Sequence, residues 1–176
     1  MNKSISHLIF RLCTFSDLDA LVRISRETFV TAFENDNDPA DFKAYIDQAF
    51  SKEQLQKELH QPDSQFHFVF WDNTLVGYFK LNSGQAQTDI KDKSSVELER
   101  IYVLAEHQGK GIGAKILEQV IAMAQKNELD YVWLGVWEHN PNAIRFYKRY
   151  GFTKFGTHPY FIGKDKQTDW LLRLDL

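Results

Sequence analysis

The order of apolar segments in this chain predicts a single α/β domain, an α/β sandwich built around a mixed sheet. The chain has 176 residues, of which 43% are hydrophobic and 14% aromatic, which is enough for one well-packed core. Its segments follow in the order strand, helices, three strands, helix, strand, helix, two strands. No repeat, low-complexity tract or linker divides the sequence, so we expect one domain over residues 1–176.

The first third of the chain predicts a strand followed by helices. Residues 8–12 form the strand, and Ser16 is a suitable N-cap for the first helix. Residues 34–41 break the helical pattern, and residues 42–59 resume it as one or two helices. The apolar positions of the first helix include Leu18, Leu21, Val22, Ile24 and Phe29.

The middle of the chain predicts three strands. Residues 66–71 and 75–81 are apolar runs separated by Asp72-Asn73-Thr74, a pattern typical of a hairpin. Residues 83–95 are polar and predict an exposed loop, and residues 96–103 form the third strand.

The last third predicts a helix, a strand, a helix and two strands. Residues 111–129 form the first helix and residues 131–137 the strand. In the next helix Asn140 is the expected N-cap, Pro141 fits the first position and Gly151 is a left-handed stop. Residues 153–174 then form two strands around a turn at residues 163–167.

A glycine-rich run lies between strand 96–103 and the helix after it. Glycines at every second position let backbone N–H groups approach a ligand closely, and the helix N-terminus adds partial positive charge. The run therefore predicts a phosphate or pyrophosphate site. It consists of Gln108, Gly109, Lys110, Gly111, Ile112, Gly113 and Ala114.

Several interpretations compete for this run. A mononucleotide loop needs G-x-x-x-x-G-K-[ST], which occurs nowhere in the chain. Gly109, Gly111 and Ala114 meet the dinucleotide pattern G-x-G-x-x-G/A, but the run lies too far from its strand and no further strand–helix units follow. Gln108, Gly111 and Gly113 meet a third pattern, Q/R-x-x-G-x-G/A. A glycine-rich turn without a ligand is the remaining alternative, and it would weaken the helix for no purpose.

A second motif follows the next strand, where residues 140–152 read N-P-N-A-I-R-F-Y-K-R-Y-G-F. Together with the glycine run, this segment resembles the GNAT N-acetyltransferase superfamily, in which N-x-x-A-x-x-F-Y-x-x-x-G-F follows the coenzyme A pyrophosphate loop. Residues 134–140 and 161–169 further resemble the PaiA-like spermidine/spermine acetyltransferase branch. The resemblance covers essentially the whole chain, although the N-terminal third matches only in the order of its elements.

The resemblance implies a GNAT-like sandwich whose central sheet is mixed, mostly antiparallel, with splayed parallel central strands. It also implies acetyl-CoA as cosubstrate and no metal. Splayed strands leave backbone groups free for the pantetheine arm. Asn140 could equally serve only as a helix cap, and Lys110 and Lys148 could be solvated cations. The expected coenzyme-binding residues are Ile101, Tyr102, Val103, Gln108, Gly109, Lys110, Gly111, Ile112, Gly113, Ala114, Asn140, Ala143, Tyr147 and Lys148.

Acetyl transfer to an amine needs a base, because an alkyl amine has a pKa near 10.4 and is almost wholly protonated at pH 7. Glu97 and Glu99 share one face of strand 96–103. The resemblance implies a glutamate base in this strand, with Glu97 the nearer positional match; the alternative is two solvated carboxylates. It also implies that Tyr147 protonates the leaving thiolate, although a core tyrosine is the alternative.

The acceptor is predicted from an acidic segment and from the PaiA-like stretches. Glu34, Asp36, Asp38 and Asp41 lie close together with no intervening Lys or Arg. In the GNAT fold this region commonly roofs the acceptor site, and carboxylates there would attract a polycation. A solvated loop is the alternative. The prediction is a small-molecule amine acceptor, above all a polyamine such as spermidine or spermine. Protein N-terminal or lysine acetylation, or a non-catalytic acyl-CoA-binding sensor, are the alternatives.

Composition narrows the remaining classes. A net charge of −3 argues against nucleic acid as a partner. No run of about 20 apolar residues occurs, so we expect no membrane partner. Cys13 is the only cysteine, which excludes an internal disulfide and suits the cytoplasm. The six histidines show no metal-ligand spacing. A homodimer is compatible with all of these features.

Overall fold

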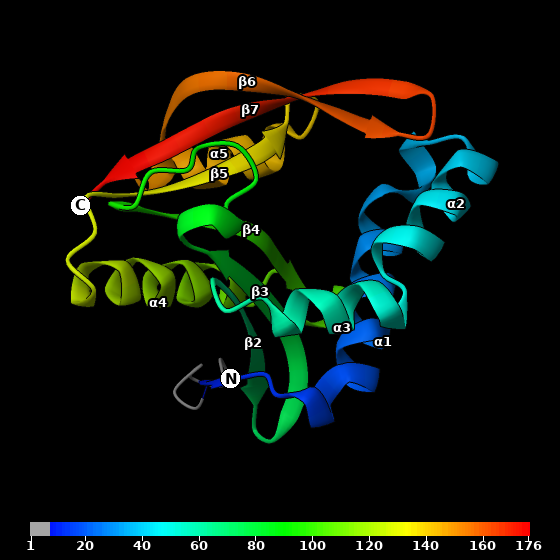
Figure 1. The fold of residues 1–176 in the computed structure, drawn as a ribbon, viewed down its shortest axis with the longest axis horizontal. Coiled ribbons are helices and arrows are strands. Elements are labelled where there is room, and N and C mark those ends of the chain that lie inside the picture. The colour runs from blue at the N-terminus through cyan, green and yellow to red at the C-terminus, as the bar shows by residue number, and fades with distance from the viewer. Residues whose placement is uncertain (1–7) are drawn as a thin grey trace.

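The computed structural model describes residues 8–176, and this part of the chain forms seven strands and five α-helices in the expected order (Figure 1). The strands are β1 (Leu8–Leu12), β2 (Ser64–Trp71), β3 (Thr74–Asn82), β4 (Ser95–Val103), β5 (Tyr131–Trp137), β6 (Thr153–Ile162) and β7 (Asp165–Asp175). The helices are α1 (Leu18–Phe33), α2 (Pro39–Ala49), α3 (Lys52–His60), α4 (Ile112–Lys126) and α5 (Pro141–Arg149).

All seven strands form one sheet in the order β1-β2-β3-β4-β5-β7-β6. Neighbouring strands are antiparallel except β4 and β5, which are parallel. Apolar side chains of α4 and α5 pack on one face of the sheet, and those of α1, α2 and α3 pack on the other. In Figure 1 the β6–β7 hairpin extends past the rest of the sheet until it lies over α2. The mixed, mostly antiparallel sandwich predicted from the sequence is confirmed.

Local sequence determines several of these boundaries. Asp72 and Asn73 have φ angles of 48° and 66°, so they form a two-residue turn whose twist matches the two strands that it joins. Asn140 accepts a hydrogen bond from the Ala143 N–H at 3.1 Å and caps α5, as predicted. Gly151 ends that helix with a φ of 90°, also as predicted.

The predicted cap of α1 is wrong. Ser16 lies inside a short 3-10 turn, Phe15–Asp17, and α1 begins only at Leu18. The turn is closed by a different pair, because the Thr14 N–H donates to the Asp17 carboxylate at 2.8 Å. Arg11 fixes the same carboxylate from β1 at 2.8 and 2.9 Å. A charged acceptor that is already held in place is a stronger partner for the backbone than the hydroxyl of Ser16.

Three other predicted boundaries also need correction. Residues 83–95 do not form a wholly exposed loop, because Gln87 is fully buried and accepts hydrogen bonds from Trp133 and Ser95 at 2.6 and 2.9 Å. The β6–β7 turn contains only Gly163 and Lys164, so β7 begins earlier than expected. Helix α4 spans Ile112–Lys126, inside the predicted range 111–129.

The parallel strands β4 and β5 separate soon after they meet. Their pairing covers only Ser95–Glu97 against Tyr131–Trp133. Beyond these residues β4 stays paired with β3 as far as Val103, and β5 stays paired with β7 as far as Trp137. The register between β3 and β4 shifts at this point, where Lys80 opposes Arg100 and Leu81 opposes Leu98. Glu99 is thus the extra residue of a bulge, which bends β4 away from β5 and produces the predicted splay.

We expect Gly151→Ala to destabilise the fold. The left-handed φ of Gly151 disfavours any side chain, and a Cβ there would lie 3.3 Å from Leu174 Cδ1. The expected cost is about 1–2 kcal/mol, which lowers the melting temperature by about 2–8 °C for a chain of this size. Calorimetry of the ligand-free protein measures this shift in melting temperature. The matched control is Gly113→Ala, because a Cβ on helical Gly113 meets no atom within 4 Å; an equal loss in both variants would contradict the conformational argument.

Candidate active site

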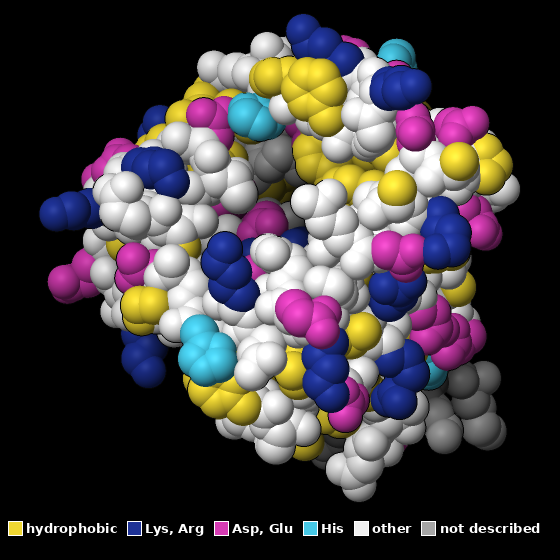
Figure 2. Space-filling model, turned by 45° about the vertical axis from the view of Figure 1, so that its right-hand side comes forward, with side chains coloured by type: hydrophobic (Ala, Val, Ile, Leu, Met, Phe, Trp, Pro, Cys, Tyr) yellow, Lys and Arg dark blue, Asp and Glu magenta, His cyan; other side chains and the backbone are white. Residues whose placement is uncertain are grey.

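The space opened between β4 and β5 is a cleft of about 850 Å³, including its mouth. Its walls come from both splayed strands, from the start and middle of α5, from α1 and from the β6–β7 hairpin. Figure 2 shows a hollow on this side of the molecule with acidic side chains at its base. Of the predicted site residues, the cleft is lined by Glu99, Ile101, Tyr102, Asn140, Ala143 and Tyr147.

The splay leaves one edge of β4 free at this cleft. Ile101 and Tyr102 pair with Phe79 and Tyr78 of β3 on one side, while no strand within residues 8–176 pairs with them on the β5 side. Peptide groups that line a cavity without a strand partner can take hydrogen bonds from an extended ligand. Val103 is placed differently: it lies outside the cleft lining, and its carbonyl accepts a hydrogen bond from Gln108 Nε2 at 3.0 Å.

The glycine-rich run forms the connection from β4 to α4, outside the cleft lining. Gly109 and Gly111 have φ angles of 72° and 81°, which glycine adopts without strain. A Cβ at Gly109 or Gly113 would meet no atom within 4 Å, so the surface in front of both is open. The N-terminus of α4, a helix of 15 residues, follows directly. These features fit the binding of a pyrophosphate.

Other predicted members of the run have structural partners. Ile112 is buried in the core, and Ala114 is half-buried in the first turn of α4. Lys110 donates from Nζ to the Glu106 carbonyl at 2.6 Å and lies over the Trp71 ring. Lys148 lies over the ring of Trp170 and is exposed. Neither ammonium group therefore lines the cleft. Each lysine is connected with the expected coenzyme site only because residues next to it in the sequence belong to that site.

Tyr147 lies on the cleft-facing side of α5. It is 7% exposed, and its ring packs between Phe146 and Phe152 at centroid distances of 5.2 and 5.7 Å. Burial raises the pKa of its hydroxyl, so the group stays protonated at neutral pH. Asn140 combines both predicted roles, since it caps α5 and also lines the cleft.

The two strand glutamates differ in their surroundings. Glu97 is 3% exposed; it accepts hydrogen bonds from Thr88 N–H and Oγ1 at 2.8 and 2.5 Å, and from Asn82 Nδ2 at 3.1 Å. Burial raises the pKa of Glu97, against the effect of these hydrogen bonds. The loop that the sequence predicted to be exposed thus covers this carboxylate.

Glu99 is held by cations. Its carboxylate lies 2.5 Å from Lys80 Nζ and 3.5 Å from Arg100 Nη2, and Asn82 Nδ2 donates to it at 2.6 Å. Burial opposes its ionisation, but the charges of Arg100 and Lys80 outweigh burial and lower the pKa of Glu99 to about 2. Glu99 is therefore a fixed negative charge at the cleft.

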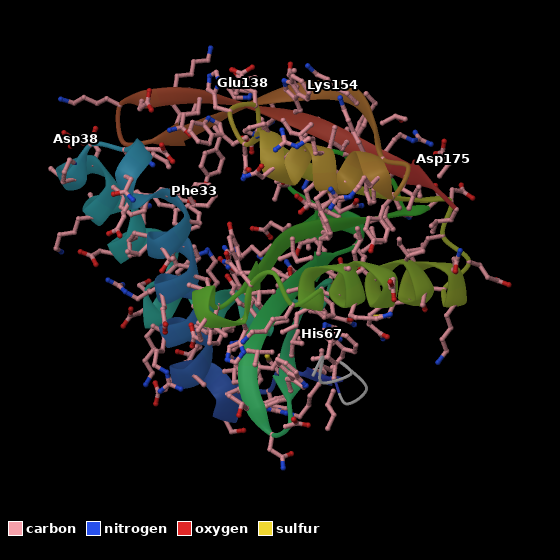
Figure 3. The ribbon with its side chains drawn as sticks, turned by 180° about the vertical axis from the view of Figure 1, so that it is seen from behind. Phe33, Asp38, His67, Glu138, Lys154 and Asp175 are labelled. Carbon is pink, nitrogen blue, oxygen red and sulfur yellow. The ribbon has the colours of Figure 1, made fainter. Side chains whose placement is uncertain are left out.

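The acidic segment between α1 and α2 lies outside the cleft lining. Glu34 and Asp36 are exposed in a 3-10 turn. Asp38 caps α2, accepting from the Ala40 and Asp41 N–H groups at 3.0 Å each. Asp41 accepts from the Lys164 N–H at 3.2 Å. In Figure 3, Asp38 lies at the outer edge of the molecule, whereas Phe33 lies on the part of α1 nearest the β6–β7 hairpin.

The β6–β7 hairpin closes the cleft from above by contacts with the α1–α2 region. The hydroxyl groups of Tyr45 and Tyr160 are in direct contact. Gln167 Nε2 donates to Asn37 Oδ1 at 3.0 Å. Together with the Asp41–Lys164 hydrogen bond, these contacts join two segments from opposite ends of the chain.

A second cavity, of about 600 Å³, adjoins the cleft and shares Glu99, Gly135, Tyr160 and Asp169 with it. Four carboxylates line this side cavity, and no Lys or Arg of the described residues does. His158, also in its lining, is paired with one of them at 2.9 Å. The four acids are Asp89, Glu97, Glu99 and Asp169.

Several lining residues were not assigned a site role from the sequence: Phe29, Phe33, Trp137, Tyr160, Gln167 and Asp169. Gln167 and Asp169 alternate on β7, so the period of a strand places both on one face. Only the pairing of β7 with β5 shows that this face meets the cleft. Within residues 8–176, no three His, Cys, Asp or Glu side chains are arranged to hold a metal ion, and no helix is long and apolar enough to cross a membrane.

The sequence model of the Acetyltransferase (GNAT) family matches residues 18–152. The chain belongs to the GNAT acetyltransferase family. It is accordingly an acetyl-CoA-dependent N-acetyltransferase, as the resemblance implied. An uncharacterized N-acetyltransferase from the pepI 3′ region of Lactobacillus delbrueckii subsp. lactis is 38% identical over 157 residues, which are 89% of this chain and 91% of that protein.

Two further relatives are informative about fold and acceptor. The PaiA N-acetyltransferase from Thermoplasma acidophilum, in its complex with coenzyme A, superposes with a TM-score of 0.76 at 22% identity, covering 97% of this chain and 99% of that one. This likeness confirms the GNAT fold. The spermine/spermidine N(1)-acetyltransferase of Bacillus subtilis is 29% identical over 85 residues, 48% of this chain and 56% of that protein.

We expect Gly113→Glu to prevent coenzyme binding by this acetyltransferase without disturbing its fold. The new carboxylate would repel phosphates at the N-terminus of α4, whereas an acid in the first helical turn is favourable for the helix itself. Affinity for acetyl-CoA should fall at least about tenfold, the effect of 1.4 kcal/mol of repulsion, as measured by calorimetry. Gln125→Glu, which adds the same charge at an exposed site of α4, is the control. Unchanged affinity in a folded Gly113→Glu protein would exclude the pyrophosphate interpretation.

Proposed function

We propose that this enzyme transfers the acetyl group of acetyl-CoA to a primary amine by direct attack, and that its acceptor is a small polyamine such as spermidine or spermine. The observation that carries the proposal is the side cavity, whose four carboxylates adjoin the cleft beside Tyr147. Three of the four, Asp89, Glu97 and Asp169, form no ion pair with a Lys or Arg among the described residues, and such carboxylates attract a cation that carries several ammonium groups.

The coenzyme would lie along the free edge of β4 and across the glycine-rich run. Backbone groups of Ile101 and Tyr102 are available for the pantetheine arm, and N–H groups of residues 109–114 for the pyrophosphate. Asn140 and Ala143 line the same wall of the cleft. Lys110 and Lys148 would add positive charge near the phosphates. The thioester supplies an activated acetyl carbonyl, so no nucleophilic cysteine is needed.

Proton transfers would fall to side chains around the cleft. Tyr147 is a protonated hydroxyl in the cleft, which suits a general acid for the leaving thiolate. The β4 glutamates remain the predicted carboxylates on the acceptor side. Glu99 is better suited to holding an ammonium group than to accepting a proton, because Arg100 and Lys80 keep its pKa low. Glu97 touches only the side cavity.

The polyamine assignment draws on two further points. The spermine/spermidine acetyltransferase of Bacillus subtilis is similar to half of this chain. Glu34 and Asp36 add exposed negative charge on the α1–α2 side of the molecule, from which an acceptor would be attracted at long range. We also propose a cytoplasmic location, since Cys13, the only cysteine, is a free buried thiol. A thiol-release assay with acetyl-CoA and polyamines, monoamines, lysine peptides and peptide N-termini tests the acceptor class.

We expect Tyr147→Phe to lower turnover by about ten- to a thousandfold while acetyl-CoA still binds. The substitution keeps the ring that packs against Phe146 and Phe152 and removes only the acidic hydroxyl. Steady-state kinetics and calorimetry separate the two quantities. Tyr150→Phe, which makes the same change one turn later on a half-buried residue, should leave turnover intact. Turnover within about twofold of the wild type for Tyr147→Phe would make Tyr147 a packing residue.

We expect Glu34→Gln combined with Asp36→Asn to raise the KM for spermidine more than that for a monoamine, with little change in kcat. The effect should shrink as salt rises, because the Debye length falls to about 8 Å near 0.15 M. Asp38 is left intact because it caps α2. Glu128→Gln with Asp130→Asn is the control: it makes an equal change of charge in the connection from α4 to β5, which lies at the opposite end of the molecule from α2 in Figure 1. Equal shifts for both amines would refute long-range attraction.

A further inference from the structure

Asp169 occupies the junction between the cleft and the side cavity. It lies on β7, opposite Trp137 of β5 and His158 of β6 in the strand register. Its side chain lies against Gly135, because a Cβ on that glycine would be 3.4 Å from Asp169 Oδ2. The absence of a side chain at residue 135 therefore leaves room for this carboxylate. Asp169 and Gly135 line both cavities, so Asp169 is accessible from either side.

Asp169 differs in its partners from the other three carboxylates of the side cavity, of which Asp89 is paired with His158 at 2.9 Å. Glu99 forms ion pairs with Lys80 and Arg100, and Glu97 accepts three hydrogen bonds from Asn82 and Thr88. Within residues 8–176, no hydrogen bond or ion pair engages the Asp169 side chain. Its oxygens are therefore available to a ligand that donates a proton.

We propose that Asp169 is the general base of this acetyltransferase, the group that takes the proton from the acceptor's ammonium nitrogen. This inference rests on the proposed function and refines it, because it moves the base from β4 to β7. Glu99, whose charge is already offset by Lys80 and Arg100, then stays ionised as a hydrogen-bond acceptor for the ammonium group at the junction, and Glu97 shapes the side cavity.

The charges around Asp169 favour this division of roles. Burial raises the pKa of Asp169 to about 6, although His158 on β6 lowers it and Glu138, after β5, raises it further. A base works best when its pKa lies near the working pH, and at pH 7 to 8 Asp169 is ionised yet far more basic than Glu99. The other titratable groups that line the two cavities are Glu97, Glu99 and Tyr102 of β4, Asp89 of the β3–β4 loop, Tyr160 of β6 and Tyr147 of α5.

Asp169 and Glu99 differ widely in the equilibrium for taking a proton from an ammonium group. Moving a proton from an ammonium group of pKa about 10.4 to Asp169, of pKa about 6, is unfavourable by about 4 pK units. Moving it to Glu99, of pKa about 2, is unfavourable by about 8. Proton transfer from the ammonium group to Asp169 is therefore much less unfavourable than transfer to Glu99.

In the acetyl-transfer step each proton that is lost by one group is taken up by another. The Asp169 carboxylate takes one proton from the ammonium and passes it to water in the side cavity. The freed lone pair forms the C–N bond to the thioester carbonyl, and the C–S bond breaks. The nitrogen loses its second proton as the amide forms, while the thiolate takes one from Tyr147, which recovers that second proton. One ammonium and one thioester give one amide, one thiol and one proton.

The test compares Asp169→Asn with Asp169→Glu, Glu97→Gln and a control, Asp175→Asn, which makes the same change at the exposed end of β7. Thiol release from acetyl-CoA is measured with spermidine from pH 5 to 9. The wild type should lose kcat/KM below an apparent pKa of about 6. Asp169→Asn should lower kcat by about a hundred- to ten-thousandfold and abolish this acid limb, while the affinity for acetyl-CoA is unchanged. Asp169→Glu should restore part of the rate together with an acid limb.

Stability provides an independent readout that separates a base from a structural residue. A carboxyl group whose pKa is higher in the folded than in the unfolded protein destabilises the fold once it ionises. Asp169→Asn should therefore melt at a higher temperature than the wild type at pH 8, with a difference that disappears toward pH 4. This result also demonstrates that the variant is folded.

These measurements separate failure of the proposed acetyltransferase function from failure of Asp169 as the base. A wild type that releases no thiol with any amine overturns the proposed function, and the inference with it. An active wild type whose Asp169→Asn variant keeps its rate within about threefold, with the acid limb intact, overturns the inference alone. If Glu97→Gln, and not Asp169→Asn, abolished the acid limb of the pH profile, the base would be Glu97 of β4 instead.

Discussion

The early end of the parallel pairing between β4 and β5 is the constraint on which the site depends. Three residue pairs hold the two strands together, and each strand then continues with its other neighbour only. The cleft is therefore bordered by rigid strands, not by loops, although it lies in the middle of a sheet. Its floor carries unpaired peptide groups and its side carries the first two turns of α5, so coenzyme and acceptor would meet where the sheet is open.

A buried charge network supports this opening from below. Glu58 of α3 lies 2.9 Å from Lys80 Nζ and 3.1 Å from Arg100 Nη1, and both cations also contact Glu99. The four side chains are balanced in charge, which offsets the cost of removing them from water. Because the bulge at Glu99 brings two adjacent residues of β4 into the same network, breaking one pair would disturb both the splay and the charge at the cleft.

Local sequence patterns predicted the elements well, because strands and helices here follow simple rules. Turn residues at Asp72 and Asn73, the Asn140 cap and the Gly151 stop all act within a few residues of themselves. Features that depend on partners far away in the sequence could not be predicted from local patterns. Thr14 with Asp17 replaced Ser16 as the cap because Arg11 approaches from β1. Gln87 is buried because Trp133, 46 residues later, donates to it.

The candidate site divides in the same way. Glycine spacing and the α5 motif predict the coenzyme side, and the backbone conformation there is as expected because the residues themselves determine it. The acidic segment at Glu34, Asp36, Asp38 and Asp41 was an obvious run in the sequence, yet Asp38 caps α2 and Asp41 accepts a hydrogen bond from Lys164 of the distant hairpin. Asp169 carried no local signal, because only the register between β5 and β7 brings it beside Gly135.

The contacts between the β6–β7 hairpin and α2 have a consequence for how such enzymes diverge. The expected coenzyme-binding residues come from one continuous stretch, residues 101–148, whereas the walls on the proposed acceptor side come from the start of β4, the N-terminal helices and the last hairpin. Tyr45 with Tyr160, and Asn37 with Gln167, make those two ends of the chain complementary to each other. A chimera that exchanges only the N-terminal helices or only the last hairpin would lose these contacts. A chimera that exchanges both segments could acquire a new acceptor while the segment between them stays unchanged.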